Sequence, residues 1–128
     1  MKIALIQAPL AWENPKENRK YFKDKINSIS EEIDLVVLPE MFSTGFTMHP
    51  ENVAETMDGE TIALLKSLAK AKNTAITGSL IIRENGKFYN RLVFVFPSGE
   101  IKKYDKRHLF SLAGEEKVYA SGTEKSVV

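Results

Sequence analysis

Short apolar segments, spaced along the first two thirds of the chain, predict the strands of a sheet. Residues 3–6 and 35–38 are continuous apolar runs, which is typical of strands buried on both faces. Residues 74–82 form a third predicted strand, and it contains Gly78. A glycine inside a strand marks a bulge or a close approach of another backbone.

Two amphipathic segments separate these strands and predict helices. Asn14, Pro15 and Glu17 have the chemistry of a helix start, with a capping side chain, a proline in the first turn and a capping-box carboxylate. Asp58 is the expected cap of the second helix, and Asn73 is its expected end. The apolar positions at helical spacing are Phe22, Ile26, Ile29 and Ile33 in the first segment and Ile62, Leu65, Leu68 and Ala69 in the second.

The remaining strands follow directly on one another. Asn85-Gly86 predicts a hairpin turn, because both central positions of a type I′ turn need a positive φ. Apolar residues alternate along 87–96, a turn is expected at 97–100, and a fifth strand at 101–105. Residues 126–128 resemble the start of another strand. Parallel β-α-β units followed by antiparallel hairpins predict an α/β fold with a mixed sheet and helices packed on it.

Composition narrows the class of protein. A chain of 128 residues with 43% hydrophobic and 27% charged residues is typical of one soluble globular domain. A net charge of +1 and the absence of a long apolar run argue against nucleic acid or a membrane as partner. The chain has no cysteine, which excludes disulfides and thiolate metal sites, and two histidines are too few for zinc. Cytoplasm is the expected location.

Two charged residues follow predicted strands. Glu40 comes after 35–38, and Lys106 comes after 101–105. The carboxyl ends of strands are where open α/β sheets bind ligands, so the two side chains are expected to share one cleft. A carboxylate that moves protons and a cation that stabilises an oxyanion are two requirements of amide hydrolysis, and the third is a nucleophile. Taken singly, however, Pro39-Glu40 also suits a turn, and Lys106 also suits an exposed surface.

Several motifs in order resemble the nitrilase superfamily, the carbon–nitrogen hydrolases. LPEMFSTGF at 38–46 is similar to its glutamate motif and YDKRHL at 104–109 to its lysine motif. Lesser signatures in family order are IALIQ at 3–7 with Asn18, Gly78-Ser79, YNR at 89–91, PSG at 97–99, and Glu115 ahead of Gly122. EMFSTGFTM at 40–48 and KRHLF at 106–110 resemble the omega-amidase branch, which hydrolyses the terminal amide of 2-oxo acids such as 2-oxoglutaramate.

The resemblance implies the N-terminal half of an α-β-β-α sandwich, with helices on one face of the mixed sheet. It also implies acyl-enzyme chemistry without metal or organic cofactor. Glu40 would be the general base and acid, Lys106 the oxyanion-stabilising cation, and Glu115 a supporting carboxylate. The family's nucleophile is a cysteine beyond the lysine, and this chain contains none. Residues 1–128 are therefore expected to form a single incomplete domain that is inactive alone, from a homo-oligomeric parent enzyme.

Other site assignments and functions stay open at this point. Phe42, Phe46 and Met48 are candidates for the substrate pocket, although core packing suits each equally well. His108 is expected to be a structural hydrogen-bonding residue. The alternative function is a non-catalytic association module that retains half the fold, and its signature would be a large exposed apolar sheet face. A nucleotide-binding fold is poorly supported, because no glycine-rich phosphate loop is present.

Overall fold

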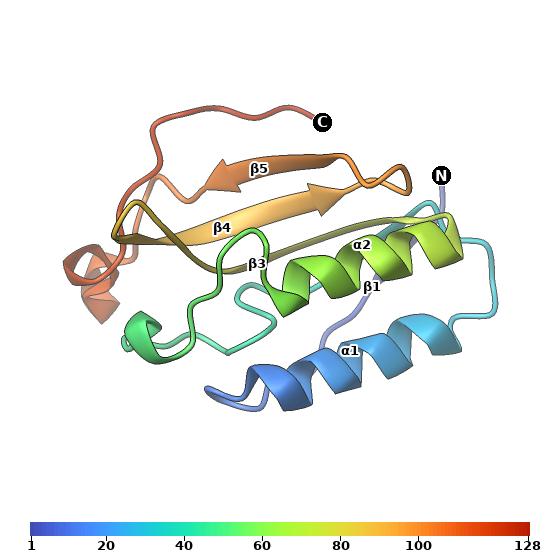
Figure 1. Ribbon diagram of the computed structural model, residues 1–128, viewed down its shortest axis with the longest axis horizontal. Helices are drawn as coiled ribbons and strands as arrows, with labels where there is room; N and C mark the ends of the chain where they lie inside the picture. Colours follow the sequence, from blue (N-terminus) through green and yellow to red (C-terminus); the bar gives the residue numbers. More distant parts are fainter.

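The computed structural model describes residues 1–128 as a five-stranded sheet with two α-helices (Figure 1). In chain order the elements are β1 (Ile3–Leu5), α1 (Pro15–Ser28), β2 (Leu35–Val37), the 3₁₀ turn η1 (Pro50–Asn52), α2 (Glu60–Lys72), β3 (Ala75–Glu84), β4 (Lys87–Val95), β5 (Ile101–Asp105), η2 (Ser111–Ala113) and η3 (Glu115–Lys117). Neither α-helix combines the length and the apolar character that crossing a membrane would need.

The strands lie in the sheet in their chain order, β1-β2-β3-β4-β5. The pairs β1–β2 and β2–β3 are parallel, whereas β3–β4 and β4–β5 are antiparallel. Both crossovers advance the sheet in the same direction, so connections of one handedness place α1 and α2 on the same face. The predicted mixed α/β sheet with helices on one face is confirmed.

Helix α1 begins as predicted but ends earlier. Asn14 Oδ1 accepts a hydrogen bond from the Glu17 backbone N–H at 3.1 Å, and Pro15 is the first helical residue. The helix stops at Ser28, whose hydroxyl donates to the Lys25 carbonyl at 2.7 Å. The prediction of a helix through Ile33 was wrong, because the following loop returns its isoleucines to the same core and so imitates helical spacing.

The cap of α2 also differs from the prediction. Gly59, not Asp58, is the N-cap residue, and it provides no side-chain hydrogen bond. The carboxylate of Glu55 takes that role by accepting from the Thr61 N–H at 2.9 Å. The C-terminal prediction is confirmed, since Asn73 ends the helix in the left-handed conformation with φ of 50°.

The predicted turn between β3 and β4 is confirmed, whereas the strand predicted at the end of the chain is not. Asn85 and Gly86 have φ of 52° and 74°, as the predicted hairpin turn requires. Residues 120–128 form no regular secondary structure, so the strand expected at 126–128 is absent. After η3 this segment turns back and runs along β5 (Figure 1).

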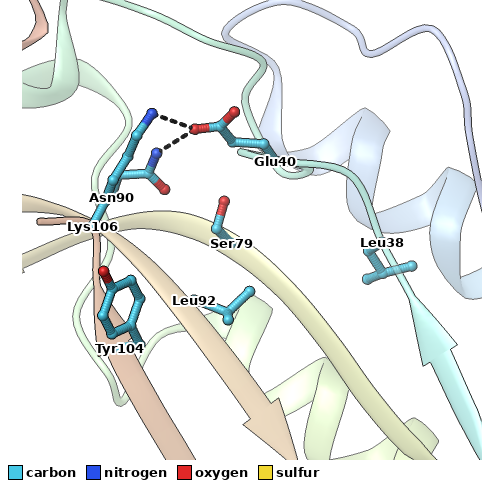
Figure 2. A pocket seen from close by; sticks show the side chains of 7 residues that line it. All are labelled: Leu38, Glu40, Ser79, Asn90, Leu92, Tyr104 and Lys106. Carbon is cyan, nitrogen blue, oxygen red and sulfur yellow. Dashed lines mark hydrogen bonds and ion pairs between the residues drawn. The ribbon is translucent and has the colours of Figure 1, made fainter. Parts of the chain in front are cut away.

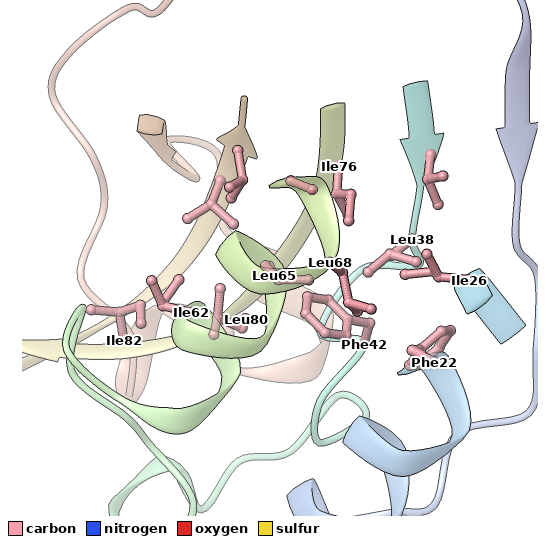
Figure 3. Packing of buried hydrophobic residues seen from close by; sticks show 14 residues of the cluster. Phe22, Ile26, Leu38, Phe42, Ile62, Leu65, Leu68, Ile76, Leu80 and Ile82 are labelled. Carbon is pink, nitrogen blue, oxygen red and sulfur yellow. The ribbon is translucent and has the colours of Figure 1, made fainter. Parts of the chain in front are cut away.

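The hydrophobic core lies between the two helices and one face of the sheet (Figure 3). Its buried members are Phe22, Ile26, Val36, Leu38, Phe42, Ile62, Leu65, Leu68, Ala69, Ile76, Leu80, Ile82, Val93 and Val95. Strand residues alternate between faces, so the opposite face carries Leu5, Leu92 and Phe94. No helix covers that face, and Leu5 is 76% exposed. We call it the open face.

Gly78 lies where the backbone of β3 meets the segment after β2. A Cβ at this position would lie 2.9 Å from Leu38 Cβ and 2.9 Å from Phe42 Cδ1, and both side chains are buried. The predicted close approach is confirmed.

We expect Gly78→Ala to lower the free energy of unfolding by about 1–3 kcal/mol, because two packed side chains would have to move. Urea unfolding would measure this, with Ser98→Ala in the exposed turn as control. An unchanged midpoint for Gly78→Ala would contradict this reading of the core.

Candidate active site

Glu40 lies just beyond the carboxyl end of β2, on a turn tied to β3. The Leu38 N–H still donates to the Thr77 carbonyl at 2.8 Å, so the chain leaves the sheet only after this residue. Met41 then adopts a φ of 49°, and its N–H donates to Ser79 Oγ at 2.9 Å. A left-handed conformation costs a residue with a side chain about 1–2 kcal/mol. The turn thus holds an unfavourable conformation next to Glu40, and local strain of this kind concentrates at functional sites.

Lys106 follows β5 and lies at the same end of the sheet. Its backbone N–H donates to the Asn90 carbonyl at 2.9 Å, and its own carbonyl accepts from the Gly122 N–H at 3.0 Å. Its Nζ lies 3.0 Å from Glu40 Oε1, although 66 residues separate the two in sequence (Figure 2). The expected convergence of these two side chains is therefore observed.

Glu115 completes an ion cluster around the lysine. Its side chain is fully buried, and Oε2 accepts from Lys106 Nζ at 3.2 Å and from the Phe110 N–H at 2.8 Å. The other oxygen, Oε1, has no hydrogen-bond partner. The ammonium of Lys106 therefore lies between one exposed and one buried carboxylate.

Asn90 is a further member of the site; the sequence motifs include it in YNR at 89–91 but assign it no role. It is 3% exposed, and its Nδ2 donates to Glu40 Oε1 at 2.8 Å (Figure 2). Oε1 of Glu40 thus accepts from both Asn90 and Lys106, while no hydrogen bond restrains Oε2. The signal in the sequence is that Asn90 interrupts an apolar face of β4, between Phe88 and Leu92. A buried polar side chain within an apolar row usually has a specific partner.

The carboxylates keep Lys106 charged. Burial by itself lowers the pKa of Lys106, but the hydrogen bonds and opposite charges of Glu40 and Glu115 outweigh this and raise it above its ordinary value. Lys106 therefore carries its proton throughout the neutral range, and the cluster keeps an ammonium at the centre of the site.

Two surface cavities meet at the ion cluster, and both include Glu40 and Lys106. The first lies on the open face and is also lined by Leu38, Ser79, Asn90, Leu92 and Tyr104 (Figure 2). The second lies beside the chain after β5 and is also lined by Phe46, His108, Leu109, Phe110 and Ala113. No three His, Cys, Asp or Glu side chains are grouped to hold a metal ion.

The residues predicted to line a pocket divide between cavity and core. Phe46 lines the second cavity. Phe42 is 1% exposed and packs edge-on against Phe22 in the core, with ring centroids 5.6 Å apart, so the core alternative holds for it. Met48 lines neither cavity. His108 lines the second cavity. Its expected structural role stays a prediction.

Comparisons with known proteins show what the chain is similar to. The sequence pattern of the carbon–nitrogen hydrolases matches residues 2–128. The chain is 39% identical to the omega-amidase YafV of Yersinia enterocolitica, over 100% of this chain and 49% of that protein. It is 32% identical to the 2-oxoglutaramate amidase of Bacillus subtilis, over 95% and 48%. The chain thus spans about half the length of the curated relatives it matches.

A solved structure supports the same grouping. The crystal structure of XC1258 from Xanthomonas campestris, a CN-hydrolase superfamily protein with an arsenic adduct in the active site, superimposes with a TM-score of 0.94. Sequence identity is 39%, and the match covers 98% of this chain and 48% of XC1258.

Proposed function

The chain belongs to the carbon–nitrogen hydrolase family, and from that membership we propose that it is the N-terminal portion of an amidase. The observation that carries the proposal is the cluster of Glu40, Lys106 and Glu115 at one end of the sheet. This cluster offers a carboxylate with a free oxygen and a charged ammonium at a shared cavity, which are two of the three parts that amide hydrolysis needs.

Lys106 is the proposed stabiliser of the oxyanion. A lysine ammonium has three N–H donors, and the contacts with Glu40 and Glu115 use two of them. The third is free to donate to the carbonyl oxygen of an amide as that oxygen gains negative charge in the tetrahedral intermediate. Glu115 is buried and lines neither cavity, so it can hold the ammonium without occupying space that a substrate would need.

Glu40 is the proposed general base and acid. Its Oε1 is occupied by two donors, so Oε2 is the oxygen that can exchange protons. In the proposed reaction a cysteine thiol of the complete protein loses its proton to Glu40 and attacks the amide carbon. The tetrahedral intermediate collapses as Glu40 returns the proton to the departing nitrogen, which releases ammonia and leaves a thioester. Water, deprotonated by Glu40, then hydrolyses the thioester.

The proposed substrate is a small terminal amide, with the omega-amide of a 2-oxo acid as first choice. The proteins named omega-amidase and 2-oxoglutaramate amidase support this through their similarity to the chain. The complete protein is proposed to need no metal or organic cofactor, to act in the cytoplasm and to form homo-oligomers. Ammonia release from 2-oxoglutaramate by a polypeptide extended past Val128 to a cysteine is the test.

The isolated 128-residue chain is expected to release no ammonia. It supplies the proposed base and cation but no thiol, and a hydroxyl without a matched base is a much weaker nucleophile. A coupled ammonia assay on the purified chain would measure this. Turnover by that chain that disappears in Glu40→Gln would contradict the proposed need for a cysteine.

The open face supports a second candidate function, that of an association module. Ile3, Leu5 and Leu92 are 50%, 76% and 42% exposed on it. Contiguous exposed apolar surface commonly marks a binding face. Binding of a hydrophobic dye by the purified chain, reversed on association with a partner, would favour this function. A monomer that binds no dye would argue against it.

A further inference from the structure

Arg91 is a buried charge with no role in the proposed chemistry. Its side chain is 1% exposed, and it lies on the face of β4 opposite Asn90. Burying an unpaired guanidinium would cost much free energy of folding. The partners of Arg91 therefore indicate its role.

Two carboxylates bind this guanidinium from neighbouring strands. Asp105 makes a bidentate pair, with 2.6 Å between Arg91 Nε and Oδ1 and 3.0 Å between Nη2 and Oδ2. Glu84 makes a second, looser pair, at 3.1 and 3.2 Å. Two parallel hydrogen bonds fix both the distance and the orientation of a carboxylate. Arg91 therefore holds Asp105 more tightly than it holds Glu84.

The pair lies directly behind the candidate active site. Arg91 and Asp105 are cross-strand neighbours in the β4–β5 register. Each of them is adjacent in sequence to a residue that contacts Glu40. Asn90 precedes Arg91 and Lys106 follows Asp105, and both bond Glu40 Oε1. The Lys106 N–H also donates to the Asn90 carbonyl at 2.9 Å. A clamp on one face of the two strands thus sets the spacing of two site residues on the other.

The segment after η3 also contacts the backbone of residues 105 and 106. The Gly122 N–H donates to the Lys106 carbonyl, and a Cβ at Gly122 would collide with the Asp105 carbonyl oxygen. Only a residue without a side chain can lie so close to Asp105. The backbone of residues 105 and 106 is therefore held from β4 and from this segment at once.

We propose that Arg91 and Asp105 form a positioning pair for Lys106, fixing the end of β5 so that the ammonium lies between Glu40 and Glu115. Arg91 and Asp105 line neither of the two cavities at the ion cluster and would not touch the substrate. The pair acts through the backbone of β5. This inference rests on the proposed function, because the position of Lys106 matters for turnover only if Lys106 acts in it. A misplacement of about 1 Å in a catalytic group can cost about 100-fold in rate.

The test compares two variants of the complete enzyme that each remove one carboxylate charge from Arg91. Asp105→Asn breaks the pair next to Lys106, and Glu84→Gln breaks the pair at the far end of the same guanidinium. We expect Asp105→Asn to lower kcat for ammonia release about 10- to 100-fold with little change in KM. Glu84→Gln should keep kcat within about twofold, although both variants should melt at lower temperature. Alkylation of the cysteine would count folded sites, so that kcat refers to folded enzyme.

Arg91→Lys provides the second variant if Asp105→Asn fails to fold. It keeps the charge but loses the bidentate geometry, so kcat should fall with a smaller loss of melting temperature. Equal kcat in Asp105→Asn and Glu84→Gln, or wild-type kcat in Arg91→Lys, would show that the pair only stabilises the sheet. That result would leave the proposed function intact if Glu40→Gln is inactive, whereas an inactive wild-type enzyme would refute the proposed function itself.

Discussion

Glu40→Gln is expected to lower kcat for ammonia release by about 10²–10⁴-fold in the complete enzyme, the range that a general base contributes. The substitution keeps the size of the side chain and an oxygen that can accept from Asn90 and Lys106. It removes the capacity to take up and return a proton, together with the negative charge that pairs with Lys106, while the Glu115 carboxylate remains as that ammonium's partner. Folding should therefore change little, and the loss should appear in kcat.

The control for this variant is Glu100→Gln, which removes an exposed carboxylate in the turn before β5. It should retain wild-type turnover. Steady-state ammonia release over a range of substrate concentrations would separate kcat from KM. Full turnover by Glu40→Gln would end the assignment of Glu40 as the base, whatever the fold.

Lys106→Met is expected to lower kcat by about 10²–10³-fold, because it removes the proposed donor to the oxyanion while keeping an apolar stem. It should also destabilise the protein by about 1–3 kcal/mol, since the buried carboxylate of Glu115 loses its charged partner. Lys102→Met, in the strand that precedes Lys106, is the control, because Lys102 is half exposed and pairs only with Glu100. Wild-type kcat in folded Lys106→Met would contradict the proposed role.

The loss of stability in Lys106→Met should depend on pH. The pKa of Lys106 is raised by its carboxylate partners, so the folded protein binds this proton more tightly than the unfolded chain does. The resulting stability is fully present below the ordinary lysine pKa of 10.5 and is lost as the pH rises through the raised value. The difference in urea midpoint between wild type and Lys106→Met should therefore persist from neutral pH to about 10 and shrink above it. A difference that shrinks already near pH 8 would contradict the raised pKa.

The elements of this protein were largely determined by local sequence. The Asn14 cap, the Asn73 stop and the Asn85-Gly86 turn all act within a few residues, and each was confirmed. The errors arose where contacts from outside the helix intervened. Ile29 and Ile33 keep helical spacing because they reach the same core from a loop, and Glu55 replaces Asp58 as a cap from outside the helix.

Only the tertiary structure decided which side chains meet. The sequence motifs identified Glu40 and Lys106, but the contact with Asn90 and the clamp of Arg91 on Asp105 depend on the register of β4 against β5. Likewise, Phe42 lies in the core and Phe46 in a cavity, although both follow the same strand. Local patterns specify backbone conformation through forces that act over a turn or a strand pair. The neighbours of a side chain are instead chosen by packing and pairing between segments far apart in the chain, and no short window of sequence contains that information.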